Sequence, residues 1–236
     1  MADSENQQPG HISPGSEGPR RDRLPMGGPR SGEERLTVAV LEALVHALEA
    51  KSGSLAGHSS RVSAYAATIA TELGLADAEV DLVRTAGRLH DLGMIGIRES
   101  VLDKAGRLTR DEYEHVKRHV EIGVHILAPL TQLSPVIQAV KGHHERWDGA
   151  GYPDGLAGDA IPVGARVIHV AEVYDALTTE RPYQNTFSEA EAIERLEEIA
   201  GSVLDPVAVD AFAASVRGRR TLSFVSLDPP PMEEDS

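Results

Sequence analysis

Two adjacent histidines, His143 and His144, open the stretch HHERWDGAGYP, which ends at Pro153 and contains the only tryptophan of the chain. Polar groups are denser here than a core segment requires. Because neighbouring side chains on a helix point about 100° apart, these two imidazoles would not readily bind one metal ion from the same side. We expect them to serve two metal ions, or one metal ion and a substrate. The glycines and the proline that follow predict a tight loop in which the backbone can approach a ligand closely.

Further histidines and carboxylates stand at or near predicted helices, and together with the pair above they form a candidate ligand set. The additional members are His58, His90 with Asp91, His119 and Glu172. Metal sites in helical bundles are built from side chains that project inward from facing helices, so these residues are expected to share one centre. A lone histidine on a helix is more often structural. We therefore assign no site role to His11, His46, His115, His125 and His169.

The composition limits the ligands and the partners. With no cysteine in the chain, disulfides and thiolate metal sites are excluded, so imidazole and carboxylate must hold any metal. The formal net charge of -14 argues against binding to DNA, RNA or an anionic membrane. No apolar stretch approaches the ~20 residues that cross a bilayer, and the N-terminus lacks the pattern of a secretory signal. We expect a cytoplasmic protein.

The elements that must position these residues are helices. Apolar residues recur at helical spacing, and no convincing alternating strand pattern occurs, so the predicted fold class is all-α. At residue 109 the chain has the spacing of a capping box, which predicts a helix start. The predicted helices cover residues 36–51, 58–73, 77–90, 109–127, 134–144, 162–177, 188–200 and 206–216. Residues 1–34 and 221–236 lack a periodic apolar face and are predicted to be disordered tails, the second of them acidic, around one domain at 35–220.

Six separated blocks resemble the HD-GYP family, a branch of the HD metal-dependent phosphohydrolases whose known chemistry is cyclic di-GMP hydrolysis. The resemblance covers about residues 38–216 and implies an HD-type helical bundle, with the metal centre in its core and a GYP loop at the rim. The blocks are HSSRV from His58, RLHDLG from Arg88, KRHVEIG from Lys117, HHERWDGAGYPDGL from His143, IPVGARV from Ile161 and VYDALTTERPY from Val173.

The resemblance also implies roles for individual residues. Asp91 is the expected bridge between two metal ions and the expected catalytic carboxylate, since two-metal phosphodiester hydrolysis needs such a bridge. One ion is expected to take His58, His90 and Glu172, and the other His119, His143 and His144. Tyr152 and Arg181 are expected to contact the dinucleotide. The cofactors would be two divalent transition-metal ions; family precedent favours iron or manganese, and zinc or nickel also suits the ligands.

Four positions depart from the family pattern. Ser54 stands where some members have a glutamate that supports a third metal ion, and Glu172 replaces the usual aspartate ligand. Met94 replaces the lysine of the HDxGK motif, and Gln184 stands where a basic residue is common. Loss of one charge contact to the transition state costs on the order of 3 kcal/mol, about a hundredfold in rate. We therefore expect a binuclear but weakened enzyme, in which Met94→Lys speeds hydrolysis.

Two kinds of function are compatible with these observations. The leading prediction is a metal-dependent phosphodiesterase in signal transduction that opens cyclic di-GMP to linear pGpG, with further hydrolysis to GMP as a second step. One alternative is a catalytically weak binding or scaffolding module that contacts a protein partner at the GYP loop. Another is hydrolysis of a different nucleotide, because a fold does not fix its substrate. An oligomer is compatible with the sequence, and no receiver or sensor domain is recognised in it.

Overall fold

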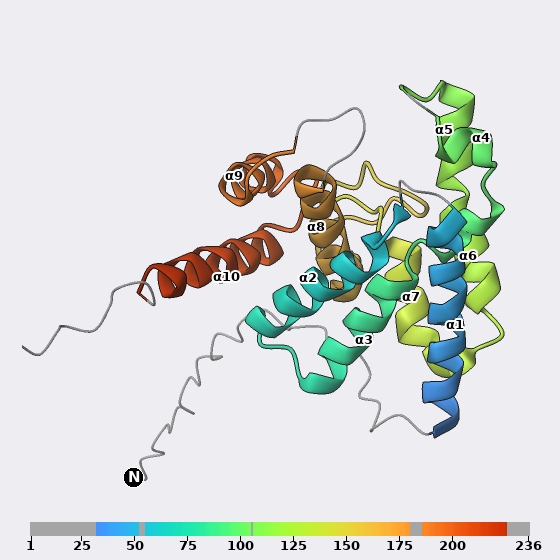
Figure 1. Ribbon diagram of the computed structural model, residues 1–236, viewed down its shortest axis with the longest axis horizontal. Coiled ribbons are helices and arrows are strands. Elements are labelled where there is room, and N and C mark those ends of the chain that lie inside the picture. Colours follow the sequence, from blue (N-terminus) through green and yellow to red (C-terminus); the bar gives the residue numbers. More distant parts are fainter. Residues whose placement is uncertain (1–31, 52–54, 105, 180–185, 226–236) are drawn as a thin grey trace, which may run out of the picture.

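In the computed structural model, residues 32–51, 55–104, 106–179 and 186–225 are described, and Figure 1 shows their arrangement. Within these ranges the chain is all-α, as predicted, and the one β-type pairing is an isolated bridge between Ala200 and Leu204. The α-helices are α1 (Gly32–Lys51), α2 (His58–Glu72), α3 (Asp77–Leu89), α4 (Glu99–Leu102), α5 (Arg110–Lys117), α6 (His119–Leu127), α7 (Ser134–Gly142), α8 (Val163–Thr178), α9 (Glu189–Ile199) and α10 (Pro206–Val225). The short 3-10 helices η2 (Leu92–Gly96), η3 (Thr131–Leu133) and η4 (Gly158–Ala160) lie between them.

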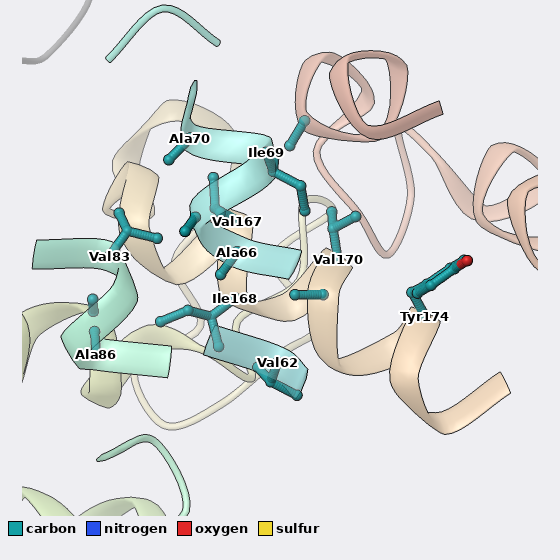
Figure 2. Close-up of a cluster of buried hydrophobic side chains, with 14 of the residues drawn as sticks. Val62, Ala66, Ile69, Ala70, Val83, Ala86, Val167, Ile168, Val170 and Tyr174 are labelled. Carbon is teal, nitrogen blue, oxygen red and sulfur yellow. The ribbon is translucent and has the colours of Figure 1, made fainter. Parts of the chain in front are cut away.

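The centre of the bundle consists of α2, α3, α7 and α8. Helix α2 packs on α3 and α8, and α7 closes the arrangement against α3 and α8. Helices α1 and α10 lie on opposite sides of this centre (Figure 1). Small and branched aliphatic side chains fill the space between the helices, as the low aromatic content of 4% requires. Figure 2 shows this core, which includes Val62, Ala66, Ile69, Val83, Ala86, Val167, Ile168 and Val170.

Two glycines permit the close contacts that bring the helix ends together. A Cβ at Gly87 of α3 would lie 3.0 Å from the Cα of Ser63, so α2 and α3 approach almost backbone to backbone. At Gly93 of η2 a Cβ would overlap the carbonyl oxygen of His119. Only glycine fits there without displacement of the backbone. The turn after α3 is thereby held against the start of α6.

The predicted helix over residues 109–127 is divided in two. The capping box is confirmed: the Thr109 side chain accepts from the Glu112 amide, and the Glu112 carboxylate accepts from the Thr109 amide at 2.7 Å. However, α5 ends at Lys117 and α6 begins at His119. The Arg118 amide donates to the His115 carbonyl three residues earlier, a tighter turn than an α-helix makes. His119 is therefore the first residue of a helix rather than a mid-helix residue.

The ends of the helical region differ slightly from the predicted domain boundaries. Helix α1 begins at Gly32, and α10 continues to Val225, past the predicted boundary at residue 220. The rest of the two predicted tails lies outside the described residues. In the described part of the chain, no helix combines the length and the apolar character that a bilayer crossing demands.

Candidate metal centre

Three imidazoles are oriented by the carbonyl groups at helix ends. The last carbonyls of a helix have no partner within the helix, so a nearby donor can take them. His90, His119 and His143 each donate Nδ1–H to the carbonyl three residues earlier, at 2.9, 2.8 and 2.6 Å. Because a carbonyl oxygen can only accept, the proton of each neutral ring must sit on Nδ1. Each Nε2 therefore presents a lone pair to the interior.

His58 is oriented by a buried carboxylate instead. Its Nδ1 lies 2.7 Å from Oδ2 of Asp175, whose other oxygen accepts from Arg61 Nε at 2.6 Å. Burial acts to raise the pKa of Asp175, but the hydrogen bonds from His58 and Arg61 outweigh it and lower the pKa to about 2. A carboxylate that accepts the Nδ1–H of a metal-binding histidine typically fixes its ring and increases its basicity.

Asp175 and Arg61 were missed in the sequence analysis, although both lie in the quoted blocks. Arg61 is three residues after His58, and Asp175 is three residues after Glu172, so each pair lies on one helix face. That spacing was the available signal.

Asp91 lies between the imidazoles, with one oxygen toward each side. Its Oδ2 is 3.6 Å from His58 Nε2 and 3.5 Å from His90 Nε2, and its Oδ1 is 3.4 Å from His119 Nε2. Burial acts to raise the pKa of Asp91, yet the surrounding imidazoles lower it to about 2. Asp91 is thus an ionised, buried carboxylate whose geometry suits a bridging ligand.

Unsatisfied lone pairs face one another in this centre. His119 Nε2 and His143 Nε2 are 3.2 Å apart, although both rings carry their proton on Nδ1. His90 Nε2 and Asp91 Oδ1 are buried without a hydrogen-bond partner in the described part of the chain. Each such buried group costs about 1–3 kcal/mol. Cations coordinated by these atoms would remove that cost, so the donor set fits bound metal ions.

The donor atoms form two groups, each within 4.8 Å: a first group of His58, His90 and Asp91, and a second group of His119, His143 and His144. Burial and the neighbouring imidazoles lower the pKa values of His143 and His144 well below the usual range. Both rings are therefore neutral and ready to bind metal at neutral pH. Imidazole with carboxylate is a donor set for divalent transition metals.

Glu172 is the one predicted ligand outside both groups. Its Oε2 lies 3.9 Å from Nδ1 of His144, on the side of the second group. The expectation that it shares an ion with His58 and His90 remains a prediction.

Tyr152 of the GYP loop covers the second group. Its ring stacks on the His144 ring with a centroid separation of 4.8 Å and an interplanar angle of 26°. Lys117 Nζ lies 5.5 Å from the centroid of the same Tyr152 ring. The predicted position of this loop at the rim thus agrees with the geometry, while its contact with substrate remains a prediction. The other predicted substrate residue, Arg181, lies outside the described residues, as do Ser54 and Gln184.

Met94 borders an apolar groove. This groove of about 360 Å³ lies between α1 and η2 and is also lined by Leu44, Ala47, Leu48, Ile95, Ile97, Glu99 and Leu102. None of these residues is a proposed metal ligand. Met94 thus borders this groove, and the expected phosphate contact from a lysine at this position remains a prediction.

One histidine that was given no site role lies beside the centre. His169 donates Nδ1–H to the Glu145 carbonyl at 3.0 Å, and its ring centroid is 6.3 Å from that of His144. Burial lowers the pKa of His169 to about 4 despite that hydrogen bond. By contrast, His125 is exposed, as expected for a residue outside the site.

The fold and the site define a class: an all-α bundle with a buried centre of five imidazoles around one carboxylate. Comparison with known proteins agrees. Residues 42–207 match the family model described as HD domain. The chain therefore belongs to the HD domain family, and the resemblance to its HD-GYP branch is confirmed by its relatives.

Two curated relatives and one solved structure illustrate the similarity. The chain is 41% identical over 187 residues to the cyclic di-GMP phosphodiesterase response regulator RpfG of Xanthomonas campestris, covering 78% of this chain and 49% of that protein. It is 38% identical over 171 residues to the 3'3'-cGAMP-specific phosphodiesterase 2 of Vibrio cholerae, covering 71% and 32%. The structure of Bd1817, an HDG"Y"P protein from Bdellovibrio bacteriovorus, matches with a TM-score of 0.59 at 20% identity, covering 78% and 63%. The chain thus spans about half the length of RpfG and about a third of the length of the other curated relative.

Proposed function

We propose that this chain is a metal-dependent phosphodiesterase that hydrolyses a cyclic dinucleotide, with cyclic di-GMP as the first candidate and linear pGpG as its product. The observation that carries the proposal is the position of Asp91, whose two oxygens face the first and second groups separately. Relatives named as cyclic di-GMP phosphodiesterases support the choice of substrate.

The reaction adds water to one phosphorus and breaks one of its ester bonds, so that the ring opens to a linear dinucleotide. Metal ions held by the residues of the two groups would supply an activated water and neutralise the phosphate oxygens. In the proposal, His58, His90 and Asp91 hold one ion, and Asp91 with His119, His143 and His144 holds the other. Iron or manganese is favoured by family precedent.

The protein's own part is to fix the ligands before substrate arrives. Four of the five imidazoles are oriented by hydrogen bonds and the fifth by stacking on Tyr152, and Asp91 lies between the two groups, so little reorganisation is needed. Preorganised polar groups of this kind account for much of enzymatic rate enhancement. Burial and nearby carboxylates raise the pKa of the Tyr152 phenol, so its hydroxyl remains a hydrogen-bond donor at the rim.

Lys117 brings positive charge to the same rim. Its Nζ pairs with Glu114 at 2.7 Å, an exposed ion pair of the kind that contributes little to stability. A phosphate could therefore replace Glu114 as the partner of Lys117.

A second substrate follows from the relatives rather than from the site. Three of them, at 37–38% identity, are named as 3'3'-cGAMP-specific phosphodiesterases. The two substrates differ in one base, whereas the chemistry at phosphorus is the same. Discrimination between them would depend on base contacts at the rim and not on the metal ligands.

The test is a chromatographic assay of the purified protein, reconstituted separately with iron, manganese, nickel and zinc. Cyclic di-GMP, 3'3'-cGAMP and cyclic di-AMP are offered at equal concentration, and Asp91→Ala is the control. We expect a linear product from at least the first substrate with wild type and none with the variant. Tight binding of the dinucleotide without turnover, at two ions per chain, would identify a binding module instead.

A further inference from the structure

His144 is the one imidazole of the two groups whose ring is not fixed by a hydrogen bond within the described part of the chain. His58, His90, His119 and His143 each donate Nδ1–H to a carboxylate or a carbonyl oxygen at 2.9 Å or less. His144 Nδ1 lies 3.9 Å from Glu172 Oε2, which is too long for a hydrogen bond. Its orientation must come from another contact.

That contact is the stacked ring of Tyr152. The two rings lie 4.8 Å apart and are inclined by only 26°, so Tyr152 covers one face of the imidazole. The loop backbone is folded against the same segment, since the Tyr152 amide donates to the His144 carbonyl at 3.2 Å. At Gly151 a Cβ would meet the Glu145 Cα and the His144 carbonyl oxygen, both at 2.6 Å. The loop and the His144 segment are therefore packed backbone to backbone.

A buried carboxylate ties this loop down immediately after Tyr152. The side chain of Glu145 accepts from the Asp154 amide at 2.7 Å with Oε1 and from the Leu156 amide at 3.1 Å with Oε2. Glu145 is 2% exposed. Hydrogen bonds to an ionised acceptor are roughly twice as strong as those between neutral groups. Both oxygens are used within the loop, so Glu145 is not a free ligand for metal.

The backbone of Glu145 is held as well, by His169 of α8 through its carbonyl oxygen at 3.0 Å. Glu145 therefore connects α8 with the segment of the GYP loop that follows Tyr152. It is the residue next to His144, but its side chain contacts the loop instead of the metal centre.

We propose that Glu145 is a positioning residue for the metal ligand His144 and that it acts through the GYP loop. Its carboxylate anchors residues 154–156, the anchored loop holds Tyr152, and the Tyr152 ring fixes the plane of the His144 imidazole. The proposal deepens the proposed function, since it gives the loop a role in the metal centre. Its measurements, hydrogen exchange in the loop and metal affinity, need no turnover and remain decisive if no dinucleotide is hydrolysed.

The test substitution is Glu145→Gln, which keeps the shape but replaces one acceptor oxygen by an NH2 group that opposes a backbone N–H. We expect hydrogen exchange at the Asp154 and Leu156 amides of the metal-free protein to accelerate at least about tenfold, the effect of losing about 1.4 kcal/mol of protection. The affinity for the second of two zinc or manganese ions should fall about 10- to 100-fold, as for other groups that orient ligands. The first ion should bind as in wild type.

Glu112→Gln is the matched control, because Glu112 also accepts a backbone amide but caps α5 away from the centre. It should leave both metal affinities unchanged. Glu145→Asp keeps the ionised acceptor on a shorter side chain and should restore part of the loss.

The route through the loop is tested with Tyr152→Ala, in which Glu145 is intact. This variant should reproduce the loss of the second ion, and the double variant Glu145→Gln/Tyr152→Ala should lose no more than either single one. Additive losses would overturn the proposal, as would accelerated loop exchange with unchanged affinity for the second ion. If Glu145→Gln fails to fold, an unchanged second-ion affinity in the folded Tyr152→Ala variant overturns it equally.

Discussion

The two ligand groups are built differently. The first group contains the Asp91 carboxylate, and its His58 ring rests on a second buried carboxylate, Asp175, which is in turn paired with Arg61. The second group has imidazoles only, and His144 within it depends on stacking with Tyr152. Negative charge retains a divalent cation, and hydrogen-bonded orientation preserves a ligand's geometry. We therefore expect the first group to bind its ion more tightly and the second group to have the less rigidly fixed ligand geometry.

The largest effect should follow from removal of the group that the two halves share. Asp91→Ala takes ligands from both ions and should reduce dinucleotide hydrolysis by more than about a thousandfold, beyond the loss of a single preorganised donor. Elemental analysis should show that both ions are lost together. His125→Ala is the control, because this exposed histidine lies on α6 outside both groups, and it should retain metal and activity. Retention of both ions by Asp91→Ala would exclude a bridging role.

Variants that remove one ligand from the first group or one from the second group distinguish the two groups by their metal content. His90→Ala leaves the first group with only His58 and Asp91, so the more tightly bound ion should be lost and only the weakly bound ion of the second group should remain. His143→Ala should retain the ion of the first group, whose three ligands are intact. Metal content after gel filtration measures both. Equal retention in the two variants would contradict the asymmetry.

The Asp175–Arg61 ion pair that supports His58 should affect the stability of the fold as well as metal binding. Asp175→Asn removes the charge that faces Arg61 and His58 in a buried position, and breaking such a pair typically costs about 3 kcal/mol or more. Urea unfolding of the metal-free protein should show this decrease, and affinity for the first ion should also fall. Glu197→Gln, at an exposed ion pair with Arg217, is the control and should stay within about 1 kcal/mol of wild type.

As the pH falls, the contribution of His169, which lies beside the second group, to stability should be lost at a higher pH than the contributions of Asp91 and Asp175. Burial keeps the pKa of His169 at about 4, against 6.5 in the unfolded chain. The unfolded state therefore binds more protons, so stability is complete above pH 6.5 and falls as the pH drops toward 4, by about 3 kcal/mol from His169 alone. The carboxylates of Asp91 and Asp175, with pKa values of about 2 against 3.8, lose their contribution only below about pH 4.

Unfolding of the chelated protein between pH 4 and 8 measures this dependence. His169→Gln should reduce the slope between pH 4 and 6.5, and the lowered pKa values of His143 and His144 should account for the slope that remains. An unchanged slope would mean that His169 is not the group responsible.

The smallest effect is expected at Met94. Restoring the family's lysine looked promising from the motif alone, but Met94 lines the apolar groove against α1, beside Glu99. An ammonium group there would turn toward Glu99 or solvent, because burial of an unpaired charge is costly. We now expect Met94→Lys to change turnover by less than about threefold at matched metal content. A hundredfold increase would show that the lysine reaches the phosphate and would restore the original expectation.

The sequence predicted the helices well, because they depend on local patterns, while the ligand assignments remain predictions. Apolar spacing and the Thr109 capping box located the helices, and the separated histidines indicated one shared centre. The break at Arg118 was not predicted, because local patterns do not show the tertiary packing of this segment, in which the start of α6 lies against Gly93. The roles of Asp175 and Glu145 could not be predicted either, since they result from partners distant along the chain. The side-chain direction of Met94 likewise depends on how α1 packs.

The hydrogen bonds of His90, His119 and His143 to helix carbonyls have a consequence for how this site tolerates change. The helix turn before each imidazole determines its orientation, so the number of residues in the helix determines the direction in which the ligand points. Insertion or deletion of one residue earlier in α3 or α7 would rotate the following histidine by about 100° away from the centre, and its carbonyl partner three residues earlier would rotate with it. Descendants of this chain should therefore vary freely in the length of the connections far from these turns. They should keep the residue count of α3 and α7 fixed, even at positions whose side chains contact nothing in the centre.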